Sequence, residues 1–426
     1  MLRLLKKLRR NERGNVLLLA GFCMPLIIGS AGLAVDTVQW VLAKRQLQRA
    51  ADSAALAGVY AAVQGSSQTA AQAVDYELNI GTPTNPTPRN ASGYTLTAAN
   101  RTVDTSAALG WTNPVKVDIR VNQVPAFSSF FLPNVQIAAS AMAATISTGV
   151  YCVVSLINTA STGITATGNG SLDLGCGMIT NSTSLSAAIA TGSSTVNATP
   201  VAAVGAIPAS NNWGSAELLP FTVKQDDPYG SLGVPTFTPC PGNGNRLDVP
   251  NKGLVDRSGD TGTHCVSTMT VNGTLRLGSA TYVIDGGVFD LGSNADVSCT
   301  GCTIILTNSD PSPTATIGGI NMNAQAKSVM TAPTSSTYNG VLFYQDRRAA
   351  VAGVNRINGG STSSFSGAMY FPRQALDVNG NAGLTFSCAQ FVAWTVEFSG
   401  NSGVNNTCSA GYGTRAIMGR HVRLVA

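Results

Sequence analysis

An uncharged, apolar stretch near the N-terminus, residues 16–35, constrains the fold more than any other feature of this sequence. As an α-helix rising about 1.5 Å per residue, a stretch of this length spans the hydrocarbon core of a bilayer. Basic residues precede it, and such residues remain on the cytoplasmic side of a membrane. We therefore expect a single-pass membrane protein whose cytoplasmic N-terminus is set by Arg3, Lys6, Lys7, Arg9, Arg10 and Arg13.

A cleaved signal peptide is the alternative interpretation of this stretch. Signal peptides have a shorter apolar core of ~7–15 residues, which ends at a small-residue cleavage site. In this chain no Gly or Pro interrupts residues 36–57, so the pattern favours a helix that continues beyond the membrane. We therefore predict a cytoplasmic basic tail (1–14), a transmembrane helix (15–36) and a helical stalk with a small α/β domain (37–148).

Net charge is concentrated at the N-terminus. The chain carries +5, and residues 1–13, with six basic residues and one acid, account for all of it. The remainder is neutral and lacks the basic patch or stripe of a nucleic-acid-binding surface. We therefore expect the lipid bilayer, and no nucleic acid, among the partners, with the bulk of the chain in the periplasm.

Small residues recur at every fourth position of the expected stalk helix, at Ala50, Ala54, Gly58 and Ala62. A face of this kind allows another backbone to approach closely. The face packs either on its own domain or on another subunit, and the sequence leaves both open.

A small sheet is predicted after the stalk helix. Residues 115–121 alternate strictly between apolar and polar, and residues 135–146 form a second strand-like run. Between them, residues 125–133 are bounded by prolines and predict one short helix. A long helix packed on a small sheet is the simplest arrangement of these segments.

After residue 148 the composition shifts to Gly, Ser, Thr and Asn, with short apolar alternations between turn residues. Three short strands per coil would give coils of about 21 residues, within the repeat range of solenoids. We expect a parallel β-helix-like solenoid over residues 149–426, with an irregular insertion near 208–262. A β-sandwich or jelly roll, with turns every ~8–12 residues, is the alternative. The apolar positions that suggest the coil recur in steps of seven, at Leu277, Ile284, Leu291 and Ile305, with Ser298 as the exception.

Nine cysteines are present, and Cys23 lies within the expected span. The other eight fit disulfides, which persist in oxidising compartments such as the periplasm. In a solenoid, cysteines roughly one coil apart can meet across adjacent coils. We therefore expect the pairs Cys152–Cys176, Cys240–Cys265, Cys299–Cys302 and Cys388–Cys408.

No catalytic, cofactor-binding or metal site is expected. Glycoside hydrolysis needs two carboxylates ~5–9.5 Å apart, and Asp285 and Asp290 are candidates without a recognisable partner base or metal. A serine nucleophile would need a histidine base, and neither His264 nor His421 lies in a recognisable motif. No phosphate-binding GxxxxGK[ST] loop is present either. We expect a protein that is not an enzyme.

Four N-terminal segments carry a family resemblance: residues 13–16 (Arg-Gly-Asn-Val), 32–36 (Gly-Leu-Ala-Val-Asp), 43–48 and 50–58. They resemble the N-terminal domain of TadG-like (TadE/G) proteins of bacterial Flp/Tad pilus assembly, over about residues 10–65. The resemblance implies an inner-membrane anchor or scaffold that works beside other Tad pilus-assembly membrane proteins and a secretion ATPase.

Two motifs of related proteins are missing. Pilins of this system carry Glu five residues after the cleaved Gly, but here Leu19 follows Gly14 at that position, which argues against processing into a filament subunit. Some relatives have a metal-dependent adhesion site that begins with Asp, where this chain has Asn158. The expected function is therefore non-catalytic anchoring or scaffolding.

The alternative function is a membrane-tethered polysaccharide-binding or polysaccharide-degrading β-helix protein. Its ligand would be pilus or cell-envelope polysaccharide. A row of exposed aromatic side chains would form the binding platform, namely Tyr344, Tyr370, Phe371 and Trp394.

Overall fold

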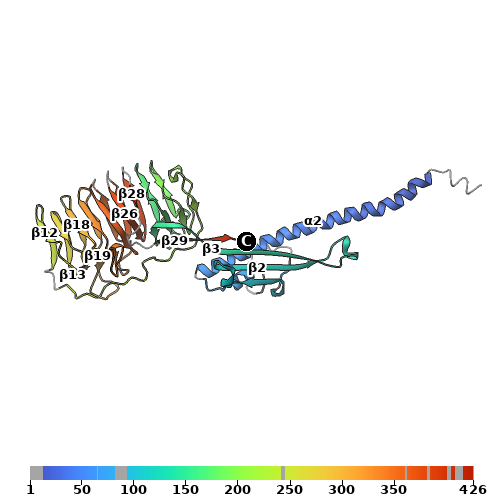
Figure 1. The fold of residues 1–426 in the computed structure, drawn as a ribbon, viewed down its shortest axis with the longest axis horizontal. Helices are drawn as coiled ribbons and strands as arrows, with labels where there is room; N and C mark the ends of the chain where they lie inside the picture. The colour runs from blue at the N-terminus through green and yellow to red at the C-terminus, as the bar shows by residue number, and fades with distance from the viewer. Residues whose placement is uncertain are drawn as a thin grey trace, which may run out of the picture. The chain divides into compact units, whose positions relative to one another are not determined.

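The structure is a computed structural model that describes residues 13–64, 66–81, 94–240, 245–359, 362–380, 384–400, 404–407 and 416–425 (Figure 1). The chain divides into two compact units, Met1–Ile146 with Val422–Ala426, and Ser147–His421. The division falls two residues before the expected start of the solenoid at residue 149.

The first unit consists of a long helix packed on an antiparallel sheet. Helix α2 (Arg13–Val63) contains Pro25 and is followed by α3 (Ala70–Glu77), which Thr69 and Gln72 cap reciprocally. Strand β2 pairs antiparallel with β1 on one side and with β3 on the other. The strands and short 3-10 turns are β1 (Arg101–Asp104), β2 (Thr112–Gln123), β3 (Val135–Ser155), η1 (Ala98–Asn100), η2 (Ala107–Leu109) and η3 (Ser128–Phe130).

The alternation in residues 115–121 produces the buried face of this sheet. Val115, Val117, Ile119 and Val121 are buried, as the period of two predicts for a half-buried strand. The short helix expected over residues 125–133 is instead the single turn η3 at the tip of the β2–β3 hairpin.

The second unit is a solenoid of parallel strands, three to a coil, which confirms the predicted β-helix-like class. Every pairing described within this unit is parallel, whereas a β-sandwich or jelly roll would contain antiparallel pairs. Strand β29 (Ile417–Leu424) leads out of it. The first ladder joins, in spatial order, β11 (Arg246–Val249), β14 (Thr268–Val271), β17 (Phe289–Leu291), β20 (Ile320–Met322), β23 (Val354–Gly359), β25 (Ala375–Gly380), β27 (Val396–Gly400), β4 (Ile164–Ala166) and β7 (Ala188–Ala190).

Two further ladders complete each coil. The second joins β12 (Leu254–Arg257), β15 (Thr274–Leu277), β18 (Asp296–Thr300), β21 (Lys327–Thr331), β24 (Ser364–Phe371), β26 (Thr385–Ala393), β28 (Val404–Thr407), β5 (Ser171–Asp173) and β8 (Thr195–Asn197). The third joins β13 (Gly262–Val266), β16 (Ala280–Asp285), β19 (Thr303–Thr307), β22 (Val341–Gln345), the later parts of β24 and β26, the end of β3, β6 (Gly177–Thr180), β9 (Val201–Ala203) and β10 (Leu218–Leu219).

The coil length agrees with the periodicity in the sequence. Thr274 pairs with Asp296, 22 residues later, close to the expected 21. Leu277, Ile284 and Leu291 point into the core inside the coils, whereas Ile305 faces the opposite side of its strand and Ile304 points inward. The step of seven therefore identifies the coil correctly but assigns the wrong face to its last member.

The coils are not stacked in sequence order. Strands β26, β27 and β28 pair with β3, β4 and β5, so the last coils of the chain stack on the first. Figure 1 shows this as red strands beside green ones. The chain therefore builds one end of the solenoid, up to β10, then returns to the other end and starts again at β11.

Residues 220–240, here called the return segment, make this connection along the outside of the third ladder. Tyr229 and Leu232 pack there with Tyr344 and Tyr370 in a second apolar cluster outside the coils. The irregular insertion expected near residues 208–262 is therefore shorter, because β11 and β12 already belong to coils. Each of these strands has only four residues, with charged side chains on the outer face, which hides the repeat in the sequence.

Candidate functional site

The membrane-spanning candidate is the N-terminal part of α2. It is the one helix among the described residues long and apolar enough to cross a bilayer. Its apolar side chains are exposed all around the helix, which suits lipid and not water. These exposed residues are Leu19, Phe22, Met24, Leu26, Ile27, Ile28, Leu33, Val35, Val38, Val41 and Leu42. The exposed apolar region therefore extends about two turns past the expected end of the span at residue 36.

The basic residues that predict the orientation fall largely outside the described part of the chain. Arg3, Lys6, Lys7, Arg9 and Arg10 lie outside the described residues, and Arg13 is described only as the first residue of α2. The orientation with a cytoplasmic N-terminus stays a prediction.

The small-residue face of α2 packs against its own domain. Ala50, Ala54 and Gly58 are buried, whereas Ala62 is exposed. A Cβ added at Gly58 would lie 2.8 Å from Val115 Cγ1 and 3.2 Å from Val74 Cγ2, so glycine allows the helix to approach β2 and α3 closely. Of the two interpretations that the sequence left open, the structure shows packing within the chain for three of the four residues.

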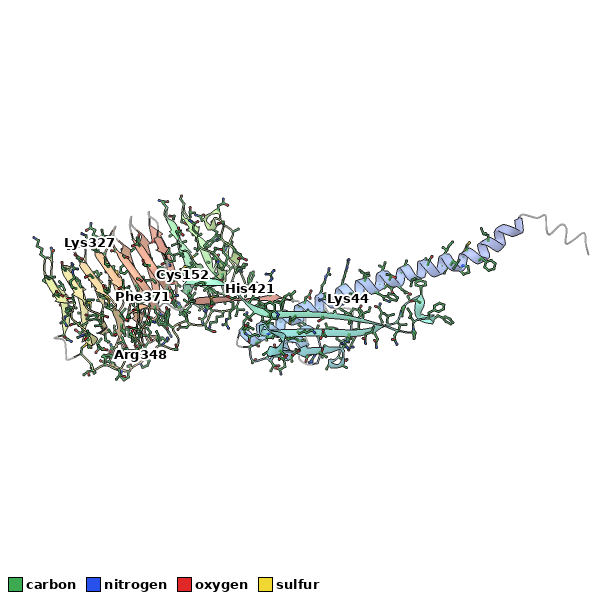
Figure 2. The ribbon with its side chains drawn as sticks, in the orientation of Figure 1. Lys44, Cys152, Lys327, Arg348, Phe371 and His421 are labelled. Carbon is green, nitrogen blue, oxygen red and sulfur yellow. A yellow bond between two sulfur atoms is a disulfide. The ribbon has the colours of Figure 1, made fainter. Side chains whose placement is uncertain are left out.

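Polar side chains of α2 bind the edge of β3 that faces away from β2. Lys44 donates to the carbonyl oxygen of Ala138 (Lys44 is labelled in Figure 2), and Gln48 Nε2 donates to the carbonyl of Ser140 at 2.7 Å. An unpaired strand edge is otherwise a template for association with other chains. The helix therefore both covers the sheet and satisfies part of its edge.

Asp36, at the end of the expected span, holds the tip of the β2–β3 hairpin. Its carboxylate accepts hydrogen bonds from the backbone N–H groups of Ala126 (2.9 Å), Phe127 (3.2 Å) and Ser128 (2.6 Å), and from Ser128 Oγ (2.7 Å). Asp36 is fully buried by these contacts. This role was not predicted; the available signals were the place of Asp36 in the segment 32–36 and its position as an isolated acid after a long uncharged stretch.

Three disulfides have both cysteines among the described residues, and all three lie in the solenoid unit. They are Cys152–Cys176, Cys240–Cys265 and Cys299–Cys302, three of the four pairs expected from sequence proximity. Cys388 is also disulfide-bonded, while its expected partner Cys408 lies outside the described residues. Cys23 is a free, exposed cysteine on α2.

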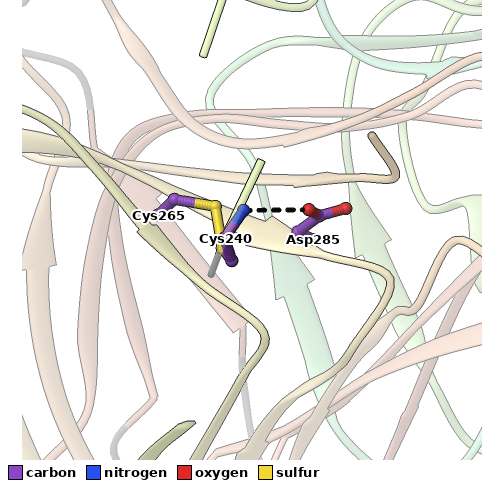
Figure 3. Close-up of side chains that lie close together, drawn as sticks. All are labelled: Cys240, Cys265 and Asp285. Carbon is purple, nitrogen blue, oxygen red and sulfur yellow. Dashed lines mark hydrogen bonds between the residues drawn. A yellow bond between two sulfur atoms is a disulfide. The ribbon is translucent and has the colours of Figure 1, made fainter. Parts of the chain in front are cut away.

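One group of potential metal ligands occurs among the described residues. Cys240, Cys265 and Asp285 bring their ligand atoms within 4.8 Å of one another (Figure 3). The two sulfur atoms are joined in a disulfide, and a metal ligand would have to be a thiolate. Asp285 instead accepts hydrogen bonds from the backbone N–H groups of Ser309 and Cys240. The group therefore attaches the end of the return segment to the solenoid.

The candidate acids Asp285 and Asp290 have structural partners, and so does the buried Asp346. Asp285 binds backbone amides, and Asp290 accepts a hydrogen bond from Asn321 Nδ2 at 2.7 Å. Asp346 binds Arg348 and Thr307; burial alone would raise the pKa of its carboxyl, but the hydrogen bonds from Arg348 and Thr307 outweigh burial and lower it. His264 Nε2 donates a hydrogen bond to the Thr261 carbonyl oxygen, and the imidazole stacks on the Tyr282 ring.

Asp377 and Glu397 are the pair of acids with the most unusual environment. They occupy paired positions on the neighbouring strands β25 and β27. Burial raises the pKa of Asp377, and burial together with the charge of Asp377 raises the pKa of Glu397. Arg356, on β23, lies 3.9 Å from Asp377. Raised carboxyl pKa values occur at general acids, but burial beside a like charge in a structural cluster produces them too.

The aromatic platform of the alternative function is not formed, because three of its four rings are buried and Trp394 is half-buried. Tyr344, Tyr370 and Phe371 are each at most 1% exposed, so the prediction of a row of exposed rings was wrong. Phe371, labelled in Figure 2, packs inside the coils, and the two tyrosines lie beneath the return segment. A sequence pattern of alternation cannot reveal that a distant segment covers the outer face of a strand.

Arg347 clamps the return segment over these tyrosines. Its guanidinium donates to the carbonyl oxygens of Leu232 (2.6 Å) and Tyr229 (2.5 Å) and lies 5.3 Å from the centre of the Tyr370 ring. Tyr370 Oη donates to Asp227 at 2.6 Å, and burial and then the Asp227 charge raise the pKa of that phenol. The clamp fixes the fold and leaves these groups unavailable to a ligand.

Comparison with known proteins finds a family match for the helical start of the first unit. Residues 14–73 match the family model described as putative Flp pilus-assembly TadE/G-like, which confirms the resemblance of this region. No curated protein and no solved structure matches the chain. The match covers most of α2 and the start of α3, and it stops before the sheet and the solenoid.

Proposed function

We propose that this chain is a non-catalytic inner-membrane component of Tad (Flp) pilus assembly that anchors a periplasmic solenoid beside the assembly machinery. The observation that carries the proposal is the TadE/G-like match at residues 14–73, which coincides with α2. This single helix contains both the exposed apolar region and the face buried against its own domain. The anchor and the domain that follows it are therefore one continuous structure.

The proposed orientation places the solenoid in the periplasm. The basic residues before the span and the disulfide-bonded cysteines after it both support this placement. A reporter that is active only in the periplasm should work when fused after residue 150. Activity of a cytoplasmic reporter at that position would overturn the proposed orientation.

The proposed partners are other membrane proteins of the Tad system. A deletion strain should make and process pilin but lose surface pili, and the full chain should restore them. Crosslinking of the full-length protein in the membrane should recover Tad components. Normal piliation of the deletion strain would contradict the proposal.

A polysaccharide-acting β-helix is the second candidate, and Asp377 with Glu397 is the observation in its favour. The two acids lie on adjacent strands, which are about 4.8 Å apart in a sheet, near the separation found in retaining glycosidases. The variant Glu397→Gln distinguishes the candidates. Full restoration of piliation by this variant is expected for a scaffold, whereas its loss with a normally folded protein would favour catalysis.

A further inference from the structure

The tip of the β2–β3 hairpin, residues 124–132, exposes an unusual amount of apolar surface. Phe130 is 89% exposed and Phe131 81%, and their rings pack edge to face on each other at 5.2 Å. Val124, Phe127 and Leu132 add further exposed apolar side chains. No Asp, Glu, Lys or Arg occurs between residues 121 and 134. A contiguous apolar patch of this kind marks a contact with a protein or a membrane.

The tip has a fixed height along α2. Asp36 binds three consecutive backbone N–H groups of the tip, and a Cβ added at Gly32 would lie 2.9 Å from Phe127 Cβ. Gly32 and Asp36 belong to the last turn of the expected span. Exposed apolar side chains of α2 continue past this height to Leu42, and the first charged residue after Asp36 is Lys44. The phenylalanines are therefore level with helix residues that face lipid.

Five backbone N–H groups of the tip have hydrogen-bond partners, which lowers the cost of placing it in an apolar medium. Irregular backbone at membrane depth is tolerated only where its polar groups have partners. Asp36 satisfies the N–H groups of residues 126–128, and the N–H groups of Phe131 and Leu132 donate to the Ser128 carbonyl at 3.0 and 2.8 Å. The same contacts offset part of the cost of placing a carboxylate near the bilayer, since Asp36 accepts hydrogen bonds from four donors.

We propose that the hairpin tip is a second membrane contact, which inserts Phe130, Phe131 and Leu132 into the leaflet where α2 leaves the bilayer. Continuity with the exposed apolar surface of α2 favours lipid over a protein partner as the occupant. Side chains such as Phe and Leu are typical of elements that lie at the headgroup boundary. The proposal rests on the membrane anchoring but not on the role in pilus assembly.

The test places an environment-sensitive fluorophore on the tip. The full-length chain, with Cys23→Ala to remove the free thiol, carries Ser129→Cys and is reconstituted in vesicles of phosphatidylethanolamine and phosphatidylglycerol. The matched control is Thr105→Cys, an exposed position of the same unit at the opposite end of β1 from the tip. The label at residue 129 should emit at shorter wavelength and lose most of its intensity to a lipid-attached quencher, while the label at residue 105 should respond only to aqueous iodide.

A second variant tests whether the phenylalanines, and not the fluorophore itself, bring residue 129 to the membrane. Phe130→Ser with Phe131→Ser should return the emission at residue 129 towards that of water, because these rings have little contact with the domain. Leu185→Ser, at an 80% exposed position in the solenoid, should leave it unchanged. Equal iodide quenching at residues 129 and 105 would overturn the proposal. So would protection of residue 129 from both quenchers, because that result identifies a protein contact. Piliation is not measured, so neither outcome depends on the assembly role.

Discussion

The two units of this molecule are stabilised in different ways. In the first, one helix of 51 residues supplies both the span and the packing face, and the sheet beneath it has few strands. In the second, strands such as β4 and β14 have only three or four residues each and gain stability by stacking on neighbouring coils. The disulfides found among the described residues all lie in this second unit.

This difference shows where each unit is vulnerable. A helix that packs through alanines and a glycine loses stability where a larger side chain pushes it away from the sheet. A solenoid whose coils are stacked out of sequence order depends on the connection between its ends, here the return segment. Substitutions that destabilise one unit should therefore leave the stability of the other unit unchanged.

The largest effect is expected from the disulfide at the end of the return segment. Cys240→Ala with Cys265→Ala opens a loop of 25 residues, which should lower the free energy of unfolding of the solenoid by about 3 kcal/mol in the chain-entropy model. Urea unfolding followed by pulse proteolysis, which reports on each unit separately, measures the change. The matched control is Cys299→Ala with Cys302→Ala, where the separation is only 3 and the loss should be about half as large. Equal losses would show that the length of the closed loop does not set the contribution of the disulfide.

Overpacking should affect the first unit in a comparable way. Gly58→Leu forces a side chain against Val115 and Val74, so the unit should lose about 2 kcal/mol while the solenoid is unchanged. Ala62→Leu, one turn later on the exposed side, should change stability by less than about 0.5 kcal/mol. The same proteolysis assay measures both variants. A wild-type midpoint for Gly58→Leu would mean that α2 shifts to accommodate the leucine.

The packing of the first unit could be predicted from sequence because the residues that form each packing face lie close together along the chain. The alternation at residues 115–121 gives one sheet face directly, and the repeat of small residues gives the helix face. The contact between Asp36 and residues 126–128 could not be predicted, since it joins positions about 90 residues apart through backbone donors that any residue offers.

The solenoid could be predicted as a class but not in its order. Apolar steps of seven identify a coil, yet they carry no information on which coils are neighbours. That order depends on pairings such as Phe391 with Val153, which join the two ends of the unit in sequence. The burial of Tyr344 and Tyr370 depends on the same long-range path, which is why the expected aromatic platform was wrong.

A substitution of Arg347, which holds the return segment over Tyr344 and Tyr370, tests how this segment is fixed. Arg347→Met keeps an unbranched apolar stem but removes the donors to Leu232 and Tyr229 and the 3.5 Å ion pair with Asp227. We expect a loss of about 1.5 kcal/mol, because two carbonyl groups lose a charged donor. Limited proteolysis should also cut the return segment faster. Arg373→Met, at an exposed turn position, is the control and should behave as wild type. Unchanged cleavage for Arg347→Met would show that the tyrosines hold the segment alone.

The smallest effect concerns the outer face of the solenoid and has a defined pH dependence. The pKa of Glu397 is raised by burial and by the charge of Asp377, so its ionised form is disfavoured in the folded state. Its favourable contribution to stability is complete below the unfolded pKa and is lost as the pH rises through the folded pKa. At pH 7 the variant Glu397→Gln should therefore be more stable than wild type by a few tenths of a kcal/mol, and the difference should shrink towards pH 4.

Urea midpoints of the solenoid at several pH values measure this difference in stability. In an Asp377→Asn background the gain should be smaller, because the repulsive partner is absent. A gain in stability that grows as the pH falls would contradict the raised pKa of Glu397. A gain of several kcal/mol would show that substitutions on the outer face of this ladder also disturb the packing of its inner face.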